Sequence, residues 1–394
     1  PQMSPTFRTT LAALALSSTL SMAPGTAWAL DASALIERYT ALAKSQGQEF
    51  KYSKIEETDS GFLIHAPIWT IAPGVDVVAV TSTFSDIKEN ADGSVVVGSI
   101  DVKTVASGSK KTKVVFENVS MKDLQIPATG SDSIASKMVY YSSFSTGEGT
   151  VFNDGRPVVS IGSSLIELSP YDETAPIKMK MEIADVAADL ANAPDPKMQA
   201  GLKDLGYGTK FTGRMDMVGD WSLAEGLMNL TQFDFTIDNV ATLSMPFSMG
   251  GYTKEVMEMM QKQQAMAKGD PKAAQAAGLM MLQKLDFRSA SVSVKDHSIT
   301  ERALKLASKK MNQPPEAIAA AAPMMIGLGM QRFQMPELTQ MISNAVGAFL
   351  QNPGTLTVSA SPEKPVNLME IVLASQANPQ GLVKLLNLKA EASN

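Results

Sequence analysis

Apolar and polar residues alternate with a period of two through most of the chain between residues 50 and 250. Lys178–Ile183 alternates charged with apolar residues, and Phe233–Asp238 does the same without interruption. Successive side chains of a β-strand point to opposite faces, so each segment would place one face on a core and the other in water. Turn-forming pairs such as Asp92-Gly93 and Asp154-Gly155 separate the segments. The pattern predicts a long meander of antiparallel strands rather than alternating strands and helices.

Helical spacing marks the segment that precedes the meander. Apolar residues fall on one face of a helix expected over Asp31–Gln46, and Gly47 is a natural stop for it. A short helix is also expected over Pro194–Leu205, because Asp195 and Pro196 form a favourable start. Residues 30–250 are therefore expected to form an N-terminal helix and a β-meander with one helical interruption.

Helices dominate after Gly251, and short strands return between them. Most of the expected helices begin at a proline or a polar cap, and they cover Thr253–Ala267, Asp270–Lys284, Ser298–Lys310, one segment from Pro315, one from Pro336 and one near Pro379. The expected strands are Phe287–Val294, Thr355–Ser359 and Leu388–Ala392. A division into two domains near residue 251 is one alternative. We favour one continuous architecture over residues 30–250 and 251–394, because these strands are too few for an independent sheet. The predicted class is α+β: a long, curved antiparallel meander with a helical insertion and closing C-terminal strands.

Two details of the helical region are specific enough to check. Ser298 and Glu301 have the spacing of a capping box, in which each side chain satisfies a free backbone amide at the start of a helix. Ala317–Met330 is the longest apolar run after the N-terminus, and Pro323 interrupts it. This run is too short to span a membrane and indicates a buried helix and turn.

The first residues have the layout of a secretory signal peptide. Arg8 is the only charged residue before Asp31, Leu11–Met22 is apolar, and Ala27-Trp28-Ala29 places small residues at the cleavage positions. Residues 1–29 are therefore predicted to be a signal peptide, cleaved between Ala29 and Leu30. The mature chain is expected to carry no transmembrane anchor.

Composition supports an exported, packing-stabilised protein. Among 394 residues there is no cysteine, which excludes disulfides, zinc–cysteine sites, iron–sulfur clusters and thiol nucleophiles. An exported protein of this size without disulfides suits a bacterial periplasm better than a eukaryotic extracellular space. The net charge of −6 argues against nucleic-acid binding.

Catalytic candidates are few. The two histidines, His65 and His297, lie outside any recognisable catalytic motif, and we expect a strand end for His65 and the turn before a helix for His297. Ser107 and Lys110 have Ser-x-x-Lys spacing, but a solvated loop explains them more simply. No residue is therefore assigned as catalytic, cofactor-binding or metal-binding.

Methionine is the one residue in excess, with 25 in the chain. Several of them recur in the helical region: Met257, Met259, Met260, Met266, Met280, Met281, Met324, Met325 and Met330. Thioether clusters can bind Cu(I) in a periplasm. Methionine also fills irregular helix packing or lines an adaptable apolar groove, and these two interpretations are favoured.

Several phrases of the sequence resemble a family of uncharacterised periplasmic proteins of alphaproteobacteria. They are Ser169-Pro170-Tyr171, Leu205-Gly206-Tyr207, Met217-Val218-Gly219-Asp220-Trp221, Gly251-Tyr252-Thr253, Phe287-Arg288-Ser289-Ala290-Ser291-Val292, Asn352-Pro353-Gly354-Thr355-Leu356-Thr357-Val358 and Pro362-Glu363-Lys364-Pro365-Val366. The resemblance implies a shared fold and supplies no site residues. At the level of fold alone, the expected meander is similar to envelope proteins of the AsmA and TamB kind, thought to handle lipids along an apolar β-groove.

These observations lead to one functional expectation and two alternatives. We expect a soluble periplasmic, non-enzymatic protein of the cell envelope, with an apolar groove for a lipid-like ligand. The first alternative is a structural or scaffold protein that binds other envelope proteins. A hydrolase using carboxylates or Ser107 and Lys110 is the second.

Overall fold

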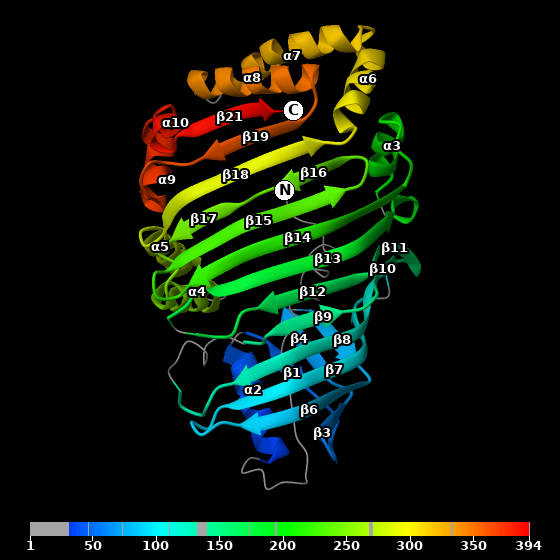
Figure 1. The fold of residues 1–394 in the computed structure, drawn as a ribbon, viewed down its shortest axis with the longest axis vertical. Helices are drawn as coiled ribbons and strands as arrows, with labels where there is room; N and C mark the ends of the chain where they lie inside the picture. Colours follow the sequence, from blue (N-terminus) through cyan, green and yellow to red (C-terminus); the bar gives the residue numbers. More distant parts are fainter. Residues whose placement is uncertain are drawn as a thin grey trace. The chain divides into compact units, whose positions relative to one another are not determined.

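The structure, a computed structural model, describes residues 31–45, 47–72, 74–109, 111–131, 140–172, 174–193, 195–267, 271–331 and 334–393. The expected signal peptide and its cleavage site lie outside these residues. The chain divides into two compact units (Figure 1). The first comprises the residues up to Tyr171 and Lys180–Pro196, and the second comprises Asp172–Met179 and the chain from Lys197 on. The change expected at residue 251 falls inside the second unit and stays a prediction.

The first unit is a helix followed by many antiparallel strands. Its elements are α2 (Ala32–Ser45), β1 (Glu49–Lys51), β2 (Lys54–Thr58), β3 (Gly61–His65), β4 (Ile68–Ala72), β5 (Val75–Ala79), β6 (Thr81–Glu89), β7 (Val95–Gly108), β8 (Thr112–Ile126), β9 (Ser143–Thr146), β10 (Gly149–Asn153), β11 (Arg156–Ile161), β12 (Ser163–Leu168), the later part of β13 (Ile177–Asp189) and the short 3-10 turn η2 (Leu190–Asn192). The longest pairing joins β7 to β8, from Val95 opposite Ile126 to Gly108 opposite Lys113.

The core of the first unit is closed. Phe62, Phe84, Phe116 and Leu124 are almost completely buried. Burial of each such side chain contributes roughly 1.5–3 kcal/mol relative to leaving it in water. Alternation along each strand therefore places a continuous apolar face on a core, as the sequence predicts.

Helix α2 begins and ends as expected. Its apolar face is buried through Leu35 and Tyr39. At its start, Asp31 Oδ1 accepts a hydrogen bond from the Ala34 amide at 2.8 Å. At its end, Gly47 has φ +76°, a conformation that favours glycine, and its amide donates to the Lys44 carbonyl at 3.0 Å.

The second unit interleaves strands with helices. Its elements are α3 (Pro196–Asp204), β14 (Lys210–Ser222), β15 (Leu227–Ile237), β16 (Ala241–Ser244), β17 (Phe247–Gly250), α4 (Lys254–Ala267), α5 (Pro271–Leu282), β18 (Asp286–Asp296), α6 (Ile299–Met311), α7 (Pro315–Met330), α8 (Pro336–Gln351), β19 (Thr355–Ala360), β20 (Val366–Asn367), α9 (Leu368–Ala377), α10 (Gly381–Leu385) and β21 (Leu388–Ser393). The α+β class, with its long antiparallel sheet and closing strands, is confirmed.

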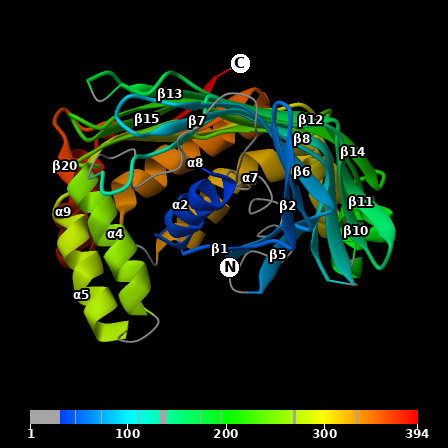
Figure 2. The ribbon, with the colours of Figure 1, turned by 90° about the horizontal axis from the view of Figure 1, so that it is seen from below.

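The helices of this unit are insertions between strands that pair with one another. β14 pairs with β15, and β15 with both β16 and β17. Both of these pair with β18, which pairs with β19, and β19 pairs with β21. Helices α4 and α5 form a hairpin between β17 and β18 (Figure 2), and α6, α7 and α8 lie between β18 and β19 in sequence.

Proline marks the helix starts correctly. Pro196, Pro271, Pro315 and Pro336 are each the first residue of a helix. The missing N–H of proline is harmless there, because the first amides of a helix have no partner within the helix. Helix α9 was not expected, because its sequence is apolar on most sides and carries no such punctuation; Asn367 Oδ1 caps it by accepting from the Met369 amide at 3.0 Å.

The predicted capping box at Ser298 is wrong. Ser298 makes no side-chain cap, and its hydroxyl instead donates to the Asn239 carbonyl. Asp296 Oδ1 caps α6 by accepting from the Thr300 amide at 2.8 Å, while Glu301 pairs with Lys305 one turn along the helix. The Ser298 hydroxyl is used in a contact with a residue distant in sequence, and Asp296 caps the helix instead.

The apolar run at Ala317–Met330 is not a buried helix and turn. Residues 315–330 form one continuous helix, α7, which includes Pro323. Ile318 and Ala319 are buried, but the side chain of Met324 is 67% exposed and that of Leu328 is 61% exposed. Hydrophobicity alone could not reveal that α7 packs on its neighbour α8 through only one side.

Candidate functional site

The strand register of the second unit sorts its side chains onto two chemically different faces. An apolar row crosses the sheet through paired residues Met215, Phe235, Leu243, Val294, Leu356 and Ala392. The flanking rows are polar: Arg214, Thr236, Thr242, Lys295, Thr355 and Ser393 on one side, and Asp216, Asp234, Ser244, Ser293, Thr357 and Glu391 on the other. Neighbours along a strand point to opposite faces, so the sheet has one apolar and one polar face.

Within the described residues, the apolar face is only partly buried. Met217 lies opposite Phe233 on it, and Val292 lies opposite Val358. All the side chains of the apolar row keep part of their surface exposed, and Val292 is 47% exposed. In the first unit, by contrast, the corresponding aromatic and aliphatic side chains are buried. The apolar face of this sheet is therefore less completely buried than that of the first unit.

Helices cover one end of the sheet of the second unit. Among the described elements, α8 packs on β21 and β19, and α7 packs on α8. Figure 1 shows α8 running beside β21. The apolar face over β14, β15 and β18 is left with its methionine and phenylalanine side chains partly exposed.

Aromatic contacts hold both ends of β14. The rings of Trp221 and Tyr252 lie 5.4 Å apart, and Trp221 Nε1 donates to the Tyr252 carbonyl at 2.9 Å. Burial raises the pKa of the Tyr252 hydroxyl, because the phenolate is poorly solvated there. At the other end, Tyr207 contacts Phe211, and the Arg302 guanidinium lies 4.2 Å above the Tyr207 ring. The strand between these anchors is roughly 40 Å long at the usual rise per residue.

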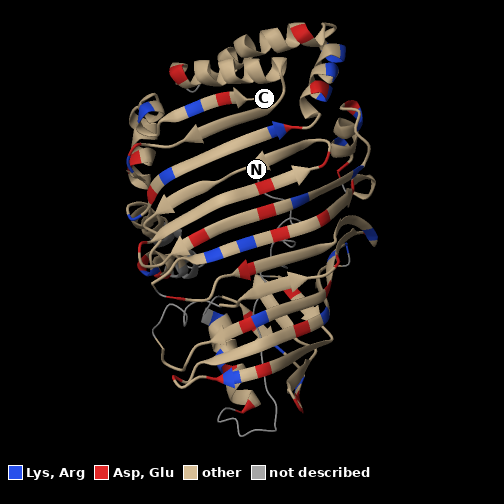
Figure 3. Cartoon of the chain, in the orientation of Figure 1, with Lys and Arg blue, Asp and Glu red and all other residues tan. Residues whose placement is uncertain are grey.

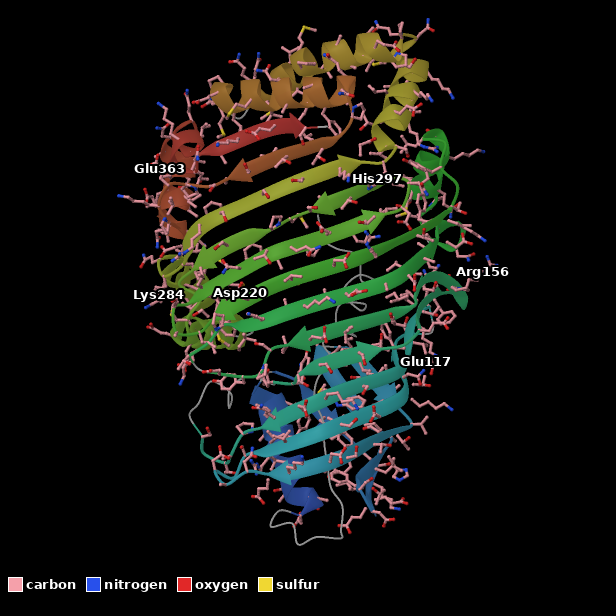
Figure 4. The ribbon with its side chains drawn as sticks, in the orientation of Figure 1. Glu117, Arg156, Asp220, Lys284, His297 and Glu363 are labelled. Carbon is pink, nitrogen blue, oxygen red and sulfur yellow. The ribbon has the colours of Figure 1, made fainter. Side chains whose placement is uncertain are left out.

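The polar face carries a shallow hollow of about 1060 Å³. At one end of it, His297 Nε2 lies 3.0 Å from Thr242 Oγ1, which lies 3.0 Å from Thr236 Oγ1. Figure 4 shows His297 beyond the end of β18 and Asp220 at the far end of the sheet. A smaller hollow of about 370 Å³ includes Ser248 in its lining.

Two carboxylates face each other across this polar face. Asp216 and Asp234 are direct partners on β14 and β15, an arrangement that is destabilising for like charges. Neighbours compensate: Arg214 Nε lies 3.3 Å from Asp216 Oδ2, and Gln232 Nε2 donates to Asp234 Oδ2 at 2.8 Å. The Ser244 hydroxyl on β16 also donates to Asp234 Oδ1. Neighbouring side chains thus engage both carboxylates, and the face resembles a solvated sheet surface.

The structure places the two histidines as expected and in different units. His65 ends β3, and its Nε2 lies 3.0 Å from Glu56 Oε2. Two hydrogen bonds lower the pKa of the Glu56 carboxyl: the one from Lys54 has the larger effect, and the one from His65 the smaller. His297 lies between β18 and α6.

Ser107 is held by the backbone. Its hydroxyl is buried at the end of β7 and donates to the Asp76 carbonyl at 2.7 Å. Lys110, its partner in the Ser-x-x-Lys hypothesis, lies outside the described residues. Within the described part of the chain, no group of three or more His, Asp or Glu side chains is arranged to hold a metal ion.

The methionines of the helical region fall into two separate helix pairs. Met257, Met259 and Met260 are on α4, and Met280 and Met281 are on α5. Met324, Met325 and Met330 are on α7. The side chain of Met266 is outside the described set. The structure therefore divides these residues between the α4–α5 hairpin and the α7–α8 pair.

The fold and this site define an α+β protein whose second unit has an antiparallel sheet with one partly exposed apolar face. A family model described as "Uncharacterized protein" matches residues 234–393, which is about two fifths of the chain. The matched region begins within β15 and reaches the end of β21, so it is similar to that family over most of the second unit. No curated protein matches the chain. Among the described helices, none is long and apolar enough to cross a membrane.

Proposed function

We propose that this is a periplasmic, non-enzymatic protein of the cell envelope that binds a lipid-like molecule on the apolar face of its second unit. The observation that carries the proposal is the row of partly exposed apolar side chains on β14, β15, β16, β18 and β19. Contiguous exposed apolar surface of this kind is typical of interaction sites. The signal peptide expected over residues 1–29 supports the periplasmic location.

The chemistry of the face favours an extended apolar ligand. Phenylalanine and methionine offer large, adaptable contact surfaces, and methionine adjusts to irregular partners. Covering such surface is favourable by roughly 25 cal/mol per Å², part of which is lost to immobilising the ligand. An alkyl chain has no polar group that would be left unpaired along the apolar row.

The proposal also includes the kind of envelope protein that this chain resembles. The sequence phrases resembling alphaproteobacterial periplasmic proteins support a place in the bacterial envelope. The likeness to AsmA- and TamB-type proteins is an analogy of fold, supported by the long antiparallel meander and the partly exposed apolar face.

Adjacent residues on β14 provide a matched test. Met217 lies on the apolar face and Val218 on the polar face, where its side chain is 36% exposed. We expect Met217→Asp to abolish uptake of a fluorescent fatty acid and Val218→Asp to leave uptake unchanged. Native mass spectrometry with lipid extraction should show a bound lipid in the parent protein and a lower occupancy in the Met217→Asp variant. Phe235→Ser is the second variant should Met217→Asp fail to fold.

Two experimental results would contradict the lipid proposal. Protein that is reproducibly empty after gentle purification, and that takes up no fluorescent fatty acid, would refute it. Equal loss of uptake in both β14 variants would also count against the apolar face.

A scaffold protein is the second candidate, because an apolar segment of another envelope protein could cover the same face. The pairing of exposed Val292 with exposed Val358 favours it, since these neighbours form a continuous patch on two strands. A photo-crosslinking residue at position 292 would then recover one dominant protein partner. Crosslinking to extractable lipid instead would support the first candidate.

A further inference from the structure

Helix α7 presents an apolar stripe to solvent. Ala317, Ala320, Met324 and Leu328 are exposed at helical spacing, and Met325 lies beside them with 51% of its side chain exposed. The only charged residue of α7 is Glu316, in its first turn. Figure 3 shows that α7 and α8 are nearly free of charged residues, whereas the strands of the same unit carry many.

Other residues of α7 pack against the protein. The opposite side of α7 is buried through Ile318 and Ala319, and the helix packs against α8. The Pro323 ring lies so close to Gly347 that a Cβ built there would be 2.7 Å from Pro323 Cγ. The Pro323 ring therefore packs directly on α8 at Gly347, on a side of α7 away from the exposed stripe.

Two lysines precede the stripe in the chain. Lys309 and Lys310 occupy the last turn of α6, which ends at Met311 with Asn312 as its cap, shortly before α7 begins. Both lysine side chains are exposed. Lys310 Nζ is 3.9 Å from Asp204 Oδ2, a distance at which an exposed ion pair is weak. Figure 3 shows the basic residues of α6 on the turns next to α7.

We propose that the α7 stripe, together with Lys309 and Lys310, docks on the surface of a lipid bilayer that contains anionic headgroups. An interfacial helix buries its apolar face at the boundary of the acyl region, and nearby lysines bind anionic headgroups. Charge argues for this occupant, because Lys309 and Lys310 complement anionic headgroups and Glu316 is the single charged side chain of α7. Docking is independent of the sheet face to which the proposed ligand binds.

Vesicle flotation with the chain from Leu30 on tests the proposal. We expect the protein to float with vesicles containing phosphatidylglycerol, less with pure phosphatidylcholine, and progressively less as salt increases. Met324→Glu combined with Leu328→Glu should lower binding at least about tenfold. Lys309→Gln combined with Lys310→Gln should remove only the gain due to phosphatidylglycerol.

Leu373 on α9 supplies the matched control. Its side chain is 59% exposed, so Leu373→Glu makes the same chemical change away from α7 and should leave flotation unchanged. Met217→Asp should also float normally, which separates this proposal from the one for the sheet. Circular dichroism and thermal unfolding should be close to those of the parent for the exposed changes at positions 309, 310, 324, 328 and 373.

The absence of cysteine allows a second, site-specific measurement. Leu328→Cys and Leu373→Cys each give a single attachment point for an environment-sensitive dye. The dye at position 328 should shift to the blue with phosphatidylglycerol vesicles, and the dye at position 373 should not. The proposal is overturned by no flotation of the parent protein, by equal dye shifts, or by a dimer that Met324→Glu with Leu328→Glu converts to a monomer.

Discussion

Gly347 shows how one missing methyl group positions a helix pair. Glycine inside a helix usually costs about 1 kcal/mol relative to alanine. At Gly347, however, a Cβ would lie 2.7 Å from Pro323 Cγ, in a ring that cannot bend away. The absence of a side chain here is therefore a packing requirement between α7 and α8.

We predict opposite effects for two glycine-to-alanine changes. Gly329→Ala in α7 meets nothing within 4 Å and should stabilise the protein by up to about 1 kcal/mol. Gly347→Ala should destabilise it by about 1–3 kcal/mol through overpacking. Chemical denaturation of both variants measures the two free energies. A stabilising Gly347→Ala would show that the helices separate without cost.

Asp296 is the functional cap of α6. Asp296→Ala should lower the free energy of unfolding by about 1 kcal/mol, because the Thr300 amide loses its acceptor. Glu301→Gln should change it by less than about 0.5 kcal/mol, since Glu301 makes only an exposed pair with Lys305. Equal losses in the two variants, measured by urea unfolding, would restore the capping-box interpretation.

Tyr252 predicts a loss of stability at alkaline pH. Burial raises the pKa of its hydroxyl in the folded protein above that in the unfolded chain. The contribution of the neutral Tyr252 hydroxyl to the free energy of unfolding is therefore fully present below the pKa of the unfolded chain. It is lost as pH rises through the pKa of the folded protein. Tyr252→Phe should reduce this alkaline loss and keep the hydrogen bond from Trp221, which uses the backbone carbonyl. Parallel unfolding curves between pH 8 and 11 compare the two proteins, and identical alkaline losses would contradict the prediction.

At the scale of elements, sequence patterns predicted where the helices and strands lie better than they predicted which elements pack together. Alternation at Phe233–Asp238 and punctuation at Pro315 and Pro336 reflect local backbone preferences, so β15, α7 and α8 were predictable. The exposure of α7 was not, because it depends on which side of that helix α8 covers. Local apolar content cannot distinguish a helix packed on two sides from one packed on a single side.

The candidate site was even less accessible from sequence. Met217 and Phe233 alternate with polar neighbours just as the buried strands of the first unit do. Whether such a face is closed depends on a covering layer from distant parts of the chain. The pairing of β18 with β19 likewise joins strands separated by three helices, which no short-range pattern specifies.

At the scale of the whole molecule, each unit has its own tryptophan. Trp69 lies in the first unit and Trp221 in the second, while Trp28 belongs to the expected signal peptide. In the chain from Leu30 on, Trp221→Phe leaves only Trp69 to report on the first unit, and Trp69→Phe leaves only Trp221 to report on the second.

We predict two unfolding transitions from these single-tryptophan proteins. The Trp221 signal should change at lower denaturant than the Trp69 signal, because the first unit has a closed core and the second has a partly exposed apolar face. Circular dichroism of each variant controls for the substitution itself. Coincident transitions in all measurements would show that the two units unfold as one cooperative structure.

The pairing of β19 with β21 also sets an order of events. In a chain delivered across a membrane with its N-terminus first, the first unit has nearly all of its strands when residue 196 has emerged. The second unit must wait until residue 393 arrives, because β21 is the strand that completes the row begun by β14. Throughout that interval the sheet is unfinished and its methionine and phenylalanine side chains lack their final neighbours. If the chain is exported as proposed, export speed and a holding chaperone would affect the yield of the second unit more strongly than that of the first.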